Sequence, residues 1–275
     1  MIAPPDFDWY AGGITDSPDY VLGYLREGLG CDPDVHRVYP KNGYTDSAVI
    51  SLGDRVLCSA SWGGNTGDRV LVTGTGENAP PVASLVRSEW PDHLLVRADV
   101  RIDVDDPTAW PTMYNMGVSL GKKHRLKLEH HGDYVRGENG RTLNIGSRQS
   151  PAYARIYEKG HQLRAEGVSG VSLDLVRFEA ELKPKRRAAR VVMASLSPAA
   201  MLGGAPFLAE AAQLLLGDDV PRVTGLNRLK RPSDRDRALA HAAHQYRKHF
   251  ASLRAELGSW GAVGDYLGKL VEPDS

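Results

Sequence analysis

The stretch Leu94-Leu-Val-Arg-Ala-Asp-Val-Arg-Ile-Asp-Val104 alternates apolar and charged residues along most of its length. Because successive side chains of a β-strand point to opposite faces of a sheet, this alternation predicts a strand with one buried face and one charged face. We expect the apolar face to pack in the core. The charged face would carry Arg97, Asp99, Arg101, Asp103 and Asp105.

Two later segments show the same alternation. In residues 153–159 one face would carry Tyr153, Arg155, Tyr157 and Lys159. In residues 176–183 it would carry Arg177, Glu179, Glu181 and Lys183. Residues 123–129 are expected to follow the same polar-outward pattern. We therefore predict several strands that pack one face and expose the other.

Strand patterns dominate up to Pro184, and helical patterns follow it. Strands followed by helices, without βαβ alternation, predict an α+β fold: a largely antiparallel twisted sheet with helices packed on one face, plus a helical C-terminal region. We expect two parts: residues 1–196 form a sheet-rich part, and residues 197–275 form a helical part that packs on it. Residues 197–217 should form two short helices, and a last helix should begin near Ser233 as its N-cap. Residues 74–76, Gly-Thr-Gly, are expected to form a turn.

The composition excludes some classes of function but does not identify one. The 275 residues have a formal net charge of zero, which argues against bulk-charge binding of DNA and favours local basic patches. The two cysteines, Cys31 and Cys58, match neither a disulfide scaffold nor a metal motif. The first residues lack an export signal, so we expect a cytoplasmic protein without a membrane span.

If the three charged strands adjoin, a tyrosine, several carboxylates and several cationic groups would gather on one face. Asp99, Asp103 and Glu179 carry hard oxygen ligands that suit Mg²⁺ or Mn²⁺. Asp99 and Asp103 would lie roughly 13 Å apart along an ideal strand, at ~3.3 Å per residue. They could share one ion only through a bulge, a strong twist or a bridging water.

A tyrosine beside cationic groups favours attack on a phosphodiester. The ordinary pKa of tyrosine is about 10, so Tyr157 needs activation, which Lys159 and a metal ion could supply. Arg155 or Arg148 could neutralise charge that develops on the phosphoryl oxygens. A phosphotyrosyl intermediate would keep the broken strand ready for rejoining. The alternative is structural: such strands are common as solvated faces with cross-strand pairs of about 0.2–1 kcal/mol.

The stretch Gly140-Arg-Thr-Leu-Asn-Ile-Gly-Ser-Arg-Gln-Ser150, followed by Ala154-Arg-Ile-Tyr-Glu-Lys-Gly160, resembles the replication initiation factor family of rolling-circle plasmids and phages. The resemblance implies that Tyr157 is the nucleophile. It extends to an upstream strand with Arg97, Asp99 and Asp103, and to a downstream strand with Arg177, Glu179, Glu181 and Leu182. Asn144 departs from the pattern, since many relatives have an aromatic residue there.

The resemblance also implies a function, a cofactor and partners. Tyr157 would nick one strand at the replication origin, stay linked to the 5′ end and free a 3′ hydroxyl for synthesis; a reverse transfer would reseal the circle. Asp99, Asp103 and Glu179 would hold the Mg²⁺ or Mn²⁺ ion, with Glu181 as a candidate fourth ligand. Expected partners are origin DNA, a host helicase and polymerase, and a second copy in a homodimer.

Candidate DNA contacts follow from charge and from the resemblance. Basic side chains of this kind mainly contact phosphates, which positions a protein without specifying sequence. Two basic runs, residues 185–190 and 228–237, are candidate DNA-contacting surfaces, although solvated surface explains the second run almost as well. The residues assigned to DNA are Arg97, Arg101, Arg148, Arg177, Lys185, Arg186 and Arg187.

Two other functions remain open. A mobilisation relaxase would use the same tyrosine chemistry at a transfer origin, and an origin-binding regulator would keep the fold without the chemistry. The strand motif of alternating histidines found in another class of nicking enzymes is missing, because His130 and His131 are adjacent and would point to opposite faces.

Overall fold

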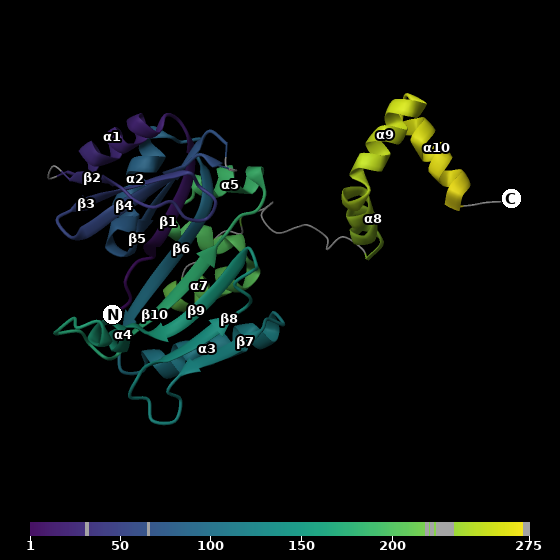
Figure 1. The fold of residues 1–275 in the computed structure, drawn as a ribbon. Helices are drawn as coiled ribbons and strands as arrows, with labels where there is room; N and C mark the ends of the chain where they lie inside the picture. Colours follow the sequence, from purple (N-terminus) through teal and green to yellow (C-terminus); the bar gives the residue numbers. More distant parts are fainter. Residues whose placement is uncertain (31–32, 65–66, 218–219, 221–222, 224–233, 272–275) are drawn as a thin grey trace. The chain divides into compact units, whose positions relative to one another are not determined.

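The structure is a computed structural model that describes residues 1–30, 33–64, 67–217, 220, 223 and 234–271. The chain divides into two compact units, Met1–Asn227 and Arg228–Ser275 (Figure 1). The expected domain boundary after residue 196 lies inside the first unit, because the helices that follow it pack there.

The first unit is built on one sheet. Among the described residues, ten strands pair in the order β2-β3-β4-β5-β1-β6-β10-β9-β8-β7, and every pairing is antiparallel. The strands are β1 (Asp6–Thr15), β2 (Asp34–Arg37), β3 (Asp46–Leu52), β4 (Arg55–Trp62), β5 (Arg69–Thr75), β6 (Leu94–Asp105), β7 (Leu128–Gly132), β8 (Arg141–Ile145), β9 (Ala152–Glu158) and β10 (Leu175–Leu182).

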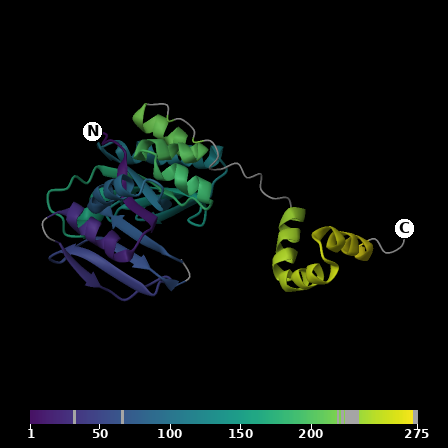
Figure 2. The same ribbon diagram turned by 90° about the horizontal axis from the view of Figure 1, so that it is seen from above.

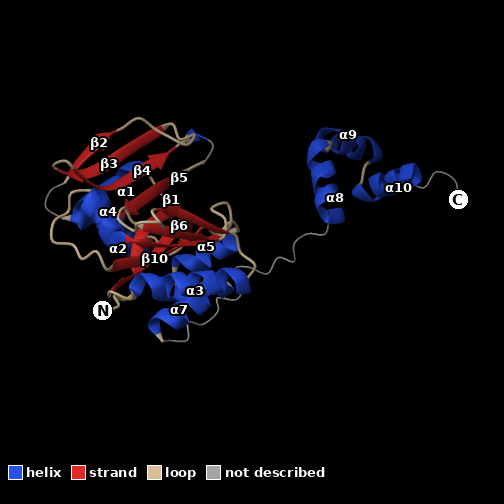
Figure 3. Ribbon diagram, turned by 90° about the horizontal axis from the view of Figure 1, so that it is seen from below, coloured by secondary structure: helices blue, strands red, loops and turns tan. Residues whose placement is uncertain are grey.

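Helices cover one face of this sheet. Helix α2 packs on β1 and β5, α5 packs on β6, and α3 packs on β8, β9 and β10. Helices α3 and α7 lie side by side (Figure 3). Residues 187–216, coloured green, lie together on one side of the strands (Figure 2). The helices of this unit are α1 (Pro18–Leu29), α2 (Ala79–Glu89), α3 (Ala109–Lys123), α4 (Lys159–Ala165), α5 (Arg187–Ala194), α6 (Pro198–Met201) and α7 (Pro206–Leu216).

The predicted α+β fold is confirmed, and its core lies where the alternation placed it. The apolar side chains of β6, Ala98, Val100 and Ile102, are completely buried under the helices. On β10, Phe178 and Ala180 are buried in the same way. The alternating strands therefore present their charged side chains on the face that these helices leave open.

Three local predictions were wrong. Gly74 and Thr75 end strand β5 instead of forming a turn; a Cβ at Gly74 would lie 2.7 Å from Val82 Cβ, so glycine lets α2 approach this strand. Lys123 ends α3, and the strand expected at residues 123–129 is β7, which begins at Leu128. Strand β9 ends at Glu158, and Lys159 begins α4.

The second unit contains the helices α8 (Asp234–Gln245), α9 (Arg247–Leu257) and α10 (Trp260–Val271). Gly258 ends α9 in the left-handed region, with φ +81°, which glycine adopts without steric cost. The predicted N-cap, Ser233, and the start of the basic run at 228–237 lie outside the described residues. No described helix has the length and apolar character that crossing a membrane would require.

Candidate active site

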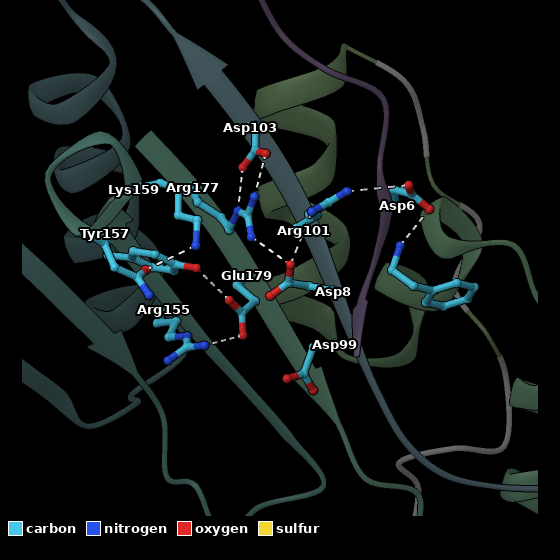
Figure 4. Close-up of polar contacts among 12 residues, drawn as sticks. Asp6, Asp8, Asp99, Arg101, Asp103, Arg155, Tyr157, Lys159, Arg177 and Glu179 are labelled. Carbon is cyan, nitrogen blue, oxygen red and sulfur yellow. Dashed lines mark hydrogen bonds and ion pairs between the residues drawn. The ribbon is translucent and has the colours of Figure 1, made fainter. Parts of the chain in front are cut away.

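The register of three neighbouring strands assembles the charged face. Strand β10 lies between β6 and β9. Arg177 of β10 stands opposite Asp103 on one side and Tyr157 on the other, and Glu179 stands opposite Arg101 and Arg155. The side chains predicted to share this face therefore meet on the open side of the sheet (Figure 4).

Tyr157 is the best-connected nucleophile candidate on this face. Its side chain is 9% exposed, and its hydroxyl donates a hydrogen bond to Glu179 Oε2 at 3.0 Å. The other oxygen of that carboxylate, Oε1, accepts a hydrogen bond from Arg155 Nη2 at 2.6 Å. The Arg155 guanidinium also lies 5.1 Å from the centre of the Tyr157 ring. Glu179 thus links the tyrosine to a cation.

The protonation of Tyr157 follows from this environment. Burial raises the pKa of Tyr157 well above its ordinary value, and the charge of Glu179 raises it further, while Arg177 and Arg155 oppose the shift. The resting side chain is therefore a neutral phenol. Its conversion to a nucleophile requires a group that takes the proton, and Glu179 already accepts the hydrogen bond.

Lys159 lies beside the tyrosine although it is outside the strand. Its Nζ is 6.0 Å from the centre of the Tyr157 ring and donates to Gln162 Oε1 at 3.3 Å. Burial and the positive charge of Arg177 lower the pKa of Lys159. The first turn of α4 therefore brings a cationic group to the place where the strand pattern expected one.

Each of the three carboxylates predicted to bind a metal is paired with an arginine. Asp99 accepts two hydrogen bonds from Arg97, at 2.8 and 2.5 Å, and Asp103 accepts two from Arg177, at 2.6 and 2.8 Å. Glu179 is paired with Arg155. In the described part of the chain, no group of three or more His, Cys, Asp or Glu side chains could hold a metal ion. The predicted three-carboxylate set does not fit one metal centre in this arrangement.

The surroundings of Asp99 shift its pKa. Burial raises the pKa of Asp99 to about 6, and the neighbouring carboxylates Glu179 and Glu181 add to the shift, while Arg97 lowers it. The Asp99 side chain is 3% exposed, so water screens its repulsion with these carboxylates poorly. Asp99, Glu179 and Glu181 thus lie close enough to affect one another at this end of the face, where Arg97 and Arg155 offset their charge.

The arginines predicted to contact DNA fall into two groups. Arg97, Arg101 and Arg177 are engaged by carboxylates of the same face. Arg148 is exposed in the turn between β8 and β9, with its guanidinium 5.6 Å from the centre of the Tyr153 ring. The remaining predicted contacts are exposed beside the start of α5, beyond the end of β10: Lys185, Arg186 and Arg187.

One residue of this face was given no role by the sequence analysis. Asp8 of β1 accepts hydrogen bonds from Arg177 at 2.7 Å and from Arg101 at 3.3 Å. It precedes Arg177 by 169 positions, so no local pattern connects the two residues. Simple alternation could not have placed it there, because Trp9 stands opposite Asp99 and the register of β1 against β6 shifts between Phe7 and Trp9.

Two open cavities lie along the β7–β9 side of the site, and one of them has Tyr157 in its wall. A cavity of about 400 Å³ has Tyr157, Arg155 and His161 in its wall. A second, of about 460 Å³, is lined by His131, Thr142, Asn144, Arg148 and Arg155. His131, Thr142 and Arg155 are common to both, so the space beside Tyr157 continues along the sheet into the second cavity.

Comparison with known proteins supports the resemblance seen in the sequence. Residues 106–213 match the replication initiation factor family. A solved structure, the rolling circle replication initiator protein from Geobacillus stearothermophilus, is similar with a TM-score of 0.55 and 17% sequence identity, over 81% of this chain and 99% of that one. No curated protein sequence matches the chain. The chain is thereby confirmed to resemble the replication initiation factors, and its fold is that of a rolling-circle replication initiator.

Proposed function

We propose that this protein initiates rolling-circle DNA replication by nicking one strand at the replication origin, with Tyr157 as the nucleophile. The observation that carries the proposal is the hydrogen bond from the Tyr157 hydroxyl to Glu179, on a sheet face that also presents Arg155, with Lys159 of α4 beside the tyrosine ring. An acceptor for the proton and cations for the phosphate are what tyrosyl transfer requires.

The proposed reaction starts with proton transfer from the Tyr157 hydroxyl to Glu179. The phenolate oxygen attacks the scissile phosphorus and forms the P–O bond of a 5′-phosphotyrosyl link, while the bond from phosphorus to the 3′ oxygen breaks. The departing 3′ oxygen takes up a proton, which Lys159 could donate because its pKa is lowered. The freed 3′ hydroxyl would prime synthesis, and the reverse transfer would reseal the strand.

The arginines have separate roles in this proposal. Arg155 lies next to Tyr157 and is placed to neutralise charge on the phosphoryl oxygens. Arg148 and the exposed basic residues at the start of α5 would contact phosphates on either side of the nick. Arg97, Arg101 and Arg177 would first hold the carboxylates of the face in position, through the ion pairs described above.

Dependence on Mg²⁺ or Mn²⁺ remains a prediction from the resemblance. A cation bound to Asp99, Asp103 or Glu179 would compete with the arginine that each carboxylate already holds. The other expected partners, a host helicase, a polymerase and a second copy of the chain, and the cytoplasmic location remain predictions in the same sense.

The proposal is tested by incubating the protein with single-stranded oligonucleotides that tile the DNA around its own gene, with Mg²⁺ or Mn²⁺. A denaturing gel would then be examined for a covalent protein–DNA band. Wild type is expected to form the band, and Tyr157→Phe is expected to bind the DNA without forming it.

Tyr153→Phe is the matched control, because Tyr153 is a buried tyrosine on the same strand and the same face. It is expected to retain the band. Clear DNA binding by wild type without any band would contradict the nicking proposal and favour the origin-binding regulator.

A further inference from the structure

The polar face of the sheet contains buried side-chain atoms that lack hydrogen-bond partners. In the described residues these are Asn144 Oδ1, Tyr153 Oη and Trp9 Nε1. Asn144 stands opposite Arg155 on β9, Tyr153 is two residues from Arg155 on that strand, and Trp9 stands opposite Asp99. All three therefore belong to the face that carries Tyr157, where a ligand could supply the missing partners.

Asn144 lines one of the two cavities described above. Its residue is 7% exposed, and it forms part of the wall of the 460 Å³ cavity with His131, Thr142, Arg148 and Arg155. Buried polar groups in folded proteins nearly always have a partner, and a buried carbonyl without one is costly. The unpaired Oδ1 of Asn144 beside an open cavity therefore indicates that a bound molecule supplies its hydrogen-bond donor.

The rest of the cavity wall indicates the charge of that molecule. Arg148 and Arg155 supply two guanidinium groups, of which that of Arg155 is also paired with Glu179, and none of the described residues that line the cavity is acidic. Guanidinium groups recognise phosphates with paired, charge-assisted hydrogen bonds. The molecule is therefore expected to combine an anionic phosphate with a neutral edge that offers a hydrogen-bond donor.

The position of the cavity relative to Tyr157 further limits which molecule could bind there. Strand β8 pairs with β9, so that Thr142 stands opposite Tyr157 and Asn144 stands opposite Arg155. Neighbouring strands of a sheet are about 4.8 Å apart. The cavity wall therefore begins one strand away from Tyr157. A DNA strand with its scissile phosphate at Tyr157 could place the neighbouring nucleotide in this cavity.

We infer that this cavity holds the nucleotide next to the scissile phosphate, with Arg148 on its phosphate and the Asn144 amide on the edge of its base. The inference rests on the proposed function and adds a base-reading residue to it. An asparagine amide pairs with adenine through one accepted and one donated hydrogen bond, so adenine is the expected base. Because Oδ1 is closed to solvent in the unbound protein, the Asn144 side chain would turn this oxygen into the cavity, where it would accept from the exocyclic amino group.

The test measures binding and not cleavage, so that it is independent of the tyrosine chemistry. The Tyr157→Phe protein would be titrated with fluorescent single-stranded octanucleotides made of one base each, and the four dissociation constants would be compared. The expected result is tightest binding of the adenine strand, by roughly 5- to 150-fold over thymine. Equal affinity for all four strands would overturn the inference.

Asn144→Leu, made in the same protein, is expected to remove the difference between the four strands. Its melting temperature is expected to be unchanged or higher, because the substitution removes an unsatisfied buried group. A preserved adenine preference, or a lower melting temperature with equal loss of affinity for every strand, would contradict base reading and indicate a structural role.

Two further variants separate the phosphate from the base. Arg148→Gln is expected to weaken binding of all four strands by the same factor, since a phosphate contact carries no sequence information. Unchanged affinity in that variant would contradict the placement of the phosphate. Gln149→Leu is the matched control, because Gln149 is an exposed amide outside the cavity wall, and it should bind as the parent does.

Discussion

Glu179 accepts the hydrogen bond of the Tyr157 hydroxyl, and this contact gives the first prediction at the scale of single residues. Glu179→Gln keeps the shape of the side chain but removes the base that takes the tyrosine proton. Nicking is expected to slow by roughly 10²- to 10⁴-fold, the usual contribution of a general base. The rate would be measured in single-turnover reactions on an origin oligonucleotide.

Glu210→Gln serves as the control for that experiment, because Glu210 is a carboxylate of helix α7 that is paired with Lys123 and His124, away from the charged face. Its rate is expected to match wild type. Wild-type nicking by Glu179→Gln would show that Tyr157 loses its proton to another group.

Asp99 gives a prediction on stability and pH. Its pKa in the folded protein is about 6, above the ordinary value of 3.8, so the folded state binds the proton more tightly than the unfolded state does. Stability therefore falls as the pH rises from about 4 to about 6, and the loss is complete above that range. A shift of this size corresponds to roughly 1–3 kcal/mol.

Asp99→Asn lacks the titrating group, so it should not lose stability in this way. Its free energy of unfolding, taken relative to that of wild type at the same pH, should therefore be higher at pH 7 than at pH 4 by roughly 1–3 kcal/mol. Urea denaturation of both proteins at the two pH values measures the change. A difference between the proteins that is the same at both pH values would contradict the assigned pKa.

At the scale of elements, helix α4 places Lys159 by packing closely on the segment before β10. A Cβ at Gly160 would lie 2.0 Å from the backbone oxygen of Ser172 and 2.9 Å from Leu173 Cα. Gly160→Ala is therefore expected to destabilise the protein by about 1–3 kcal/mol and to slow nicking, because α4 must move and carry Lys159 with it.

Gly23→Ala is the control, because Gly23 lies inside helix α1 and a Cβ there meets no atom within 4 Å. Alanine at that position is expected to stabilise the protein by roughly 0.5–1 kcal/mol without affecting nicking. Thermal unfolding and nicking rates of both variants check the pair. Equal stability of Gly160→Ala and wild type would contradict the close packing of α4.

The same elements show what the sequence could predict. Strands β6, β9 and β10 follow the two-residue alternation of their apolar side chains, because one face of each packs under helices, and this placed Tyr157, Arg155 and Glu179 on one face. Helix α3 was missed, since Pro111 and two glycines obscure its pattern. Gly117 and Gly121 are required by packing, because a Cβ would lie 2.7 Å from Ile156 Cδ1 and 2.4 Å from Leu128 Cδ2.

The pairing of side chains within the site was beyond the sequence. Alternation shows which residues share a face but not which carboxylate meets which arginine, and the register that joins Arg177 to Asp103 and Asp8 arises from strands far apart in the chain. Asn144 was noted only as a departure from the family pattern. Its unsatisfied oxygen and its place in a cavity wall became visible in the folded protein.

At the scale of the whole molecule, the proposed chemistry is confined to the first compact unit. Tyr157, Glu179 and every strand that carries the site lie within Met1–Asn227, whereas α8, α9 and α10 belong to the second unit. A protein truncated after Asn227 is therefore expected to fold and to form the covalent band on an origin oligonucleotide at the wild-type rate. Loss of the band in a folded truncation would assign part of the reaction to the C-terminal helices.

The central claim is that the DNA strand becomes linked to Tyr157, and mass spectrometry of the covalent complex tests it most directly. After nuclease and trypsin digestion, the nucleotide is predicted on the peptide Ile156–Lys159, released by cleavage after Arg155 and Lys159. A nucleotide on residues 149–155, which contain Tyr153, or on any other peptide, would contradict the assignment of Tyr157 as the nucleophile.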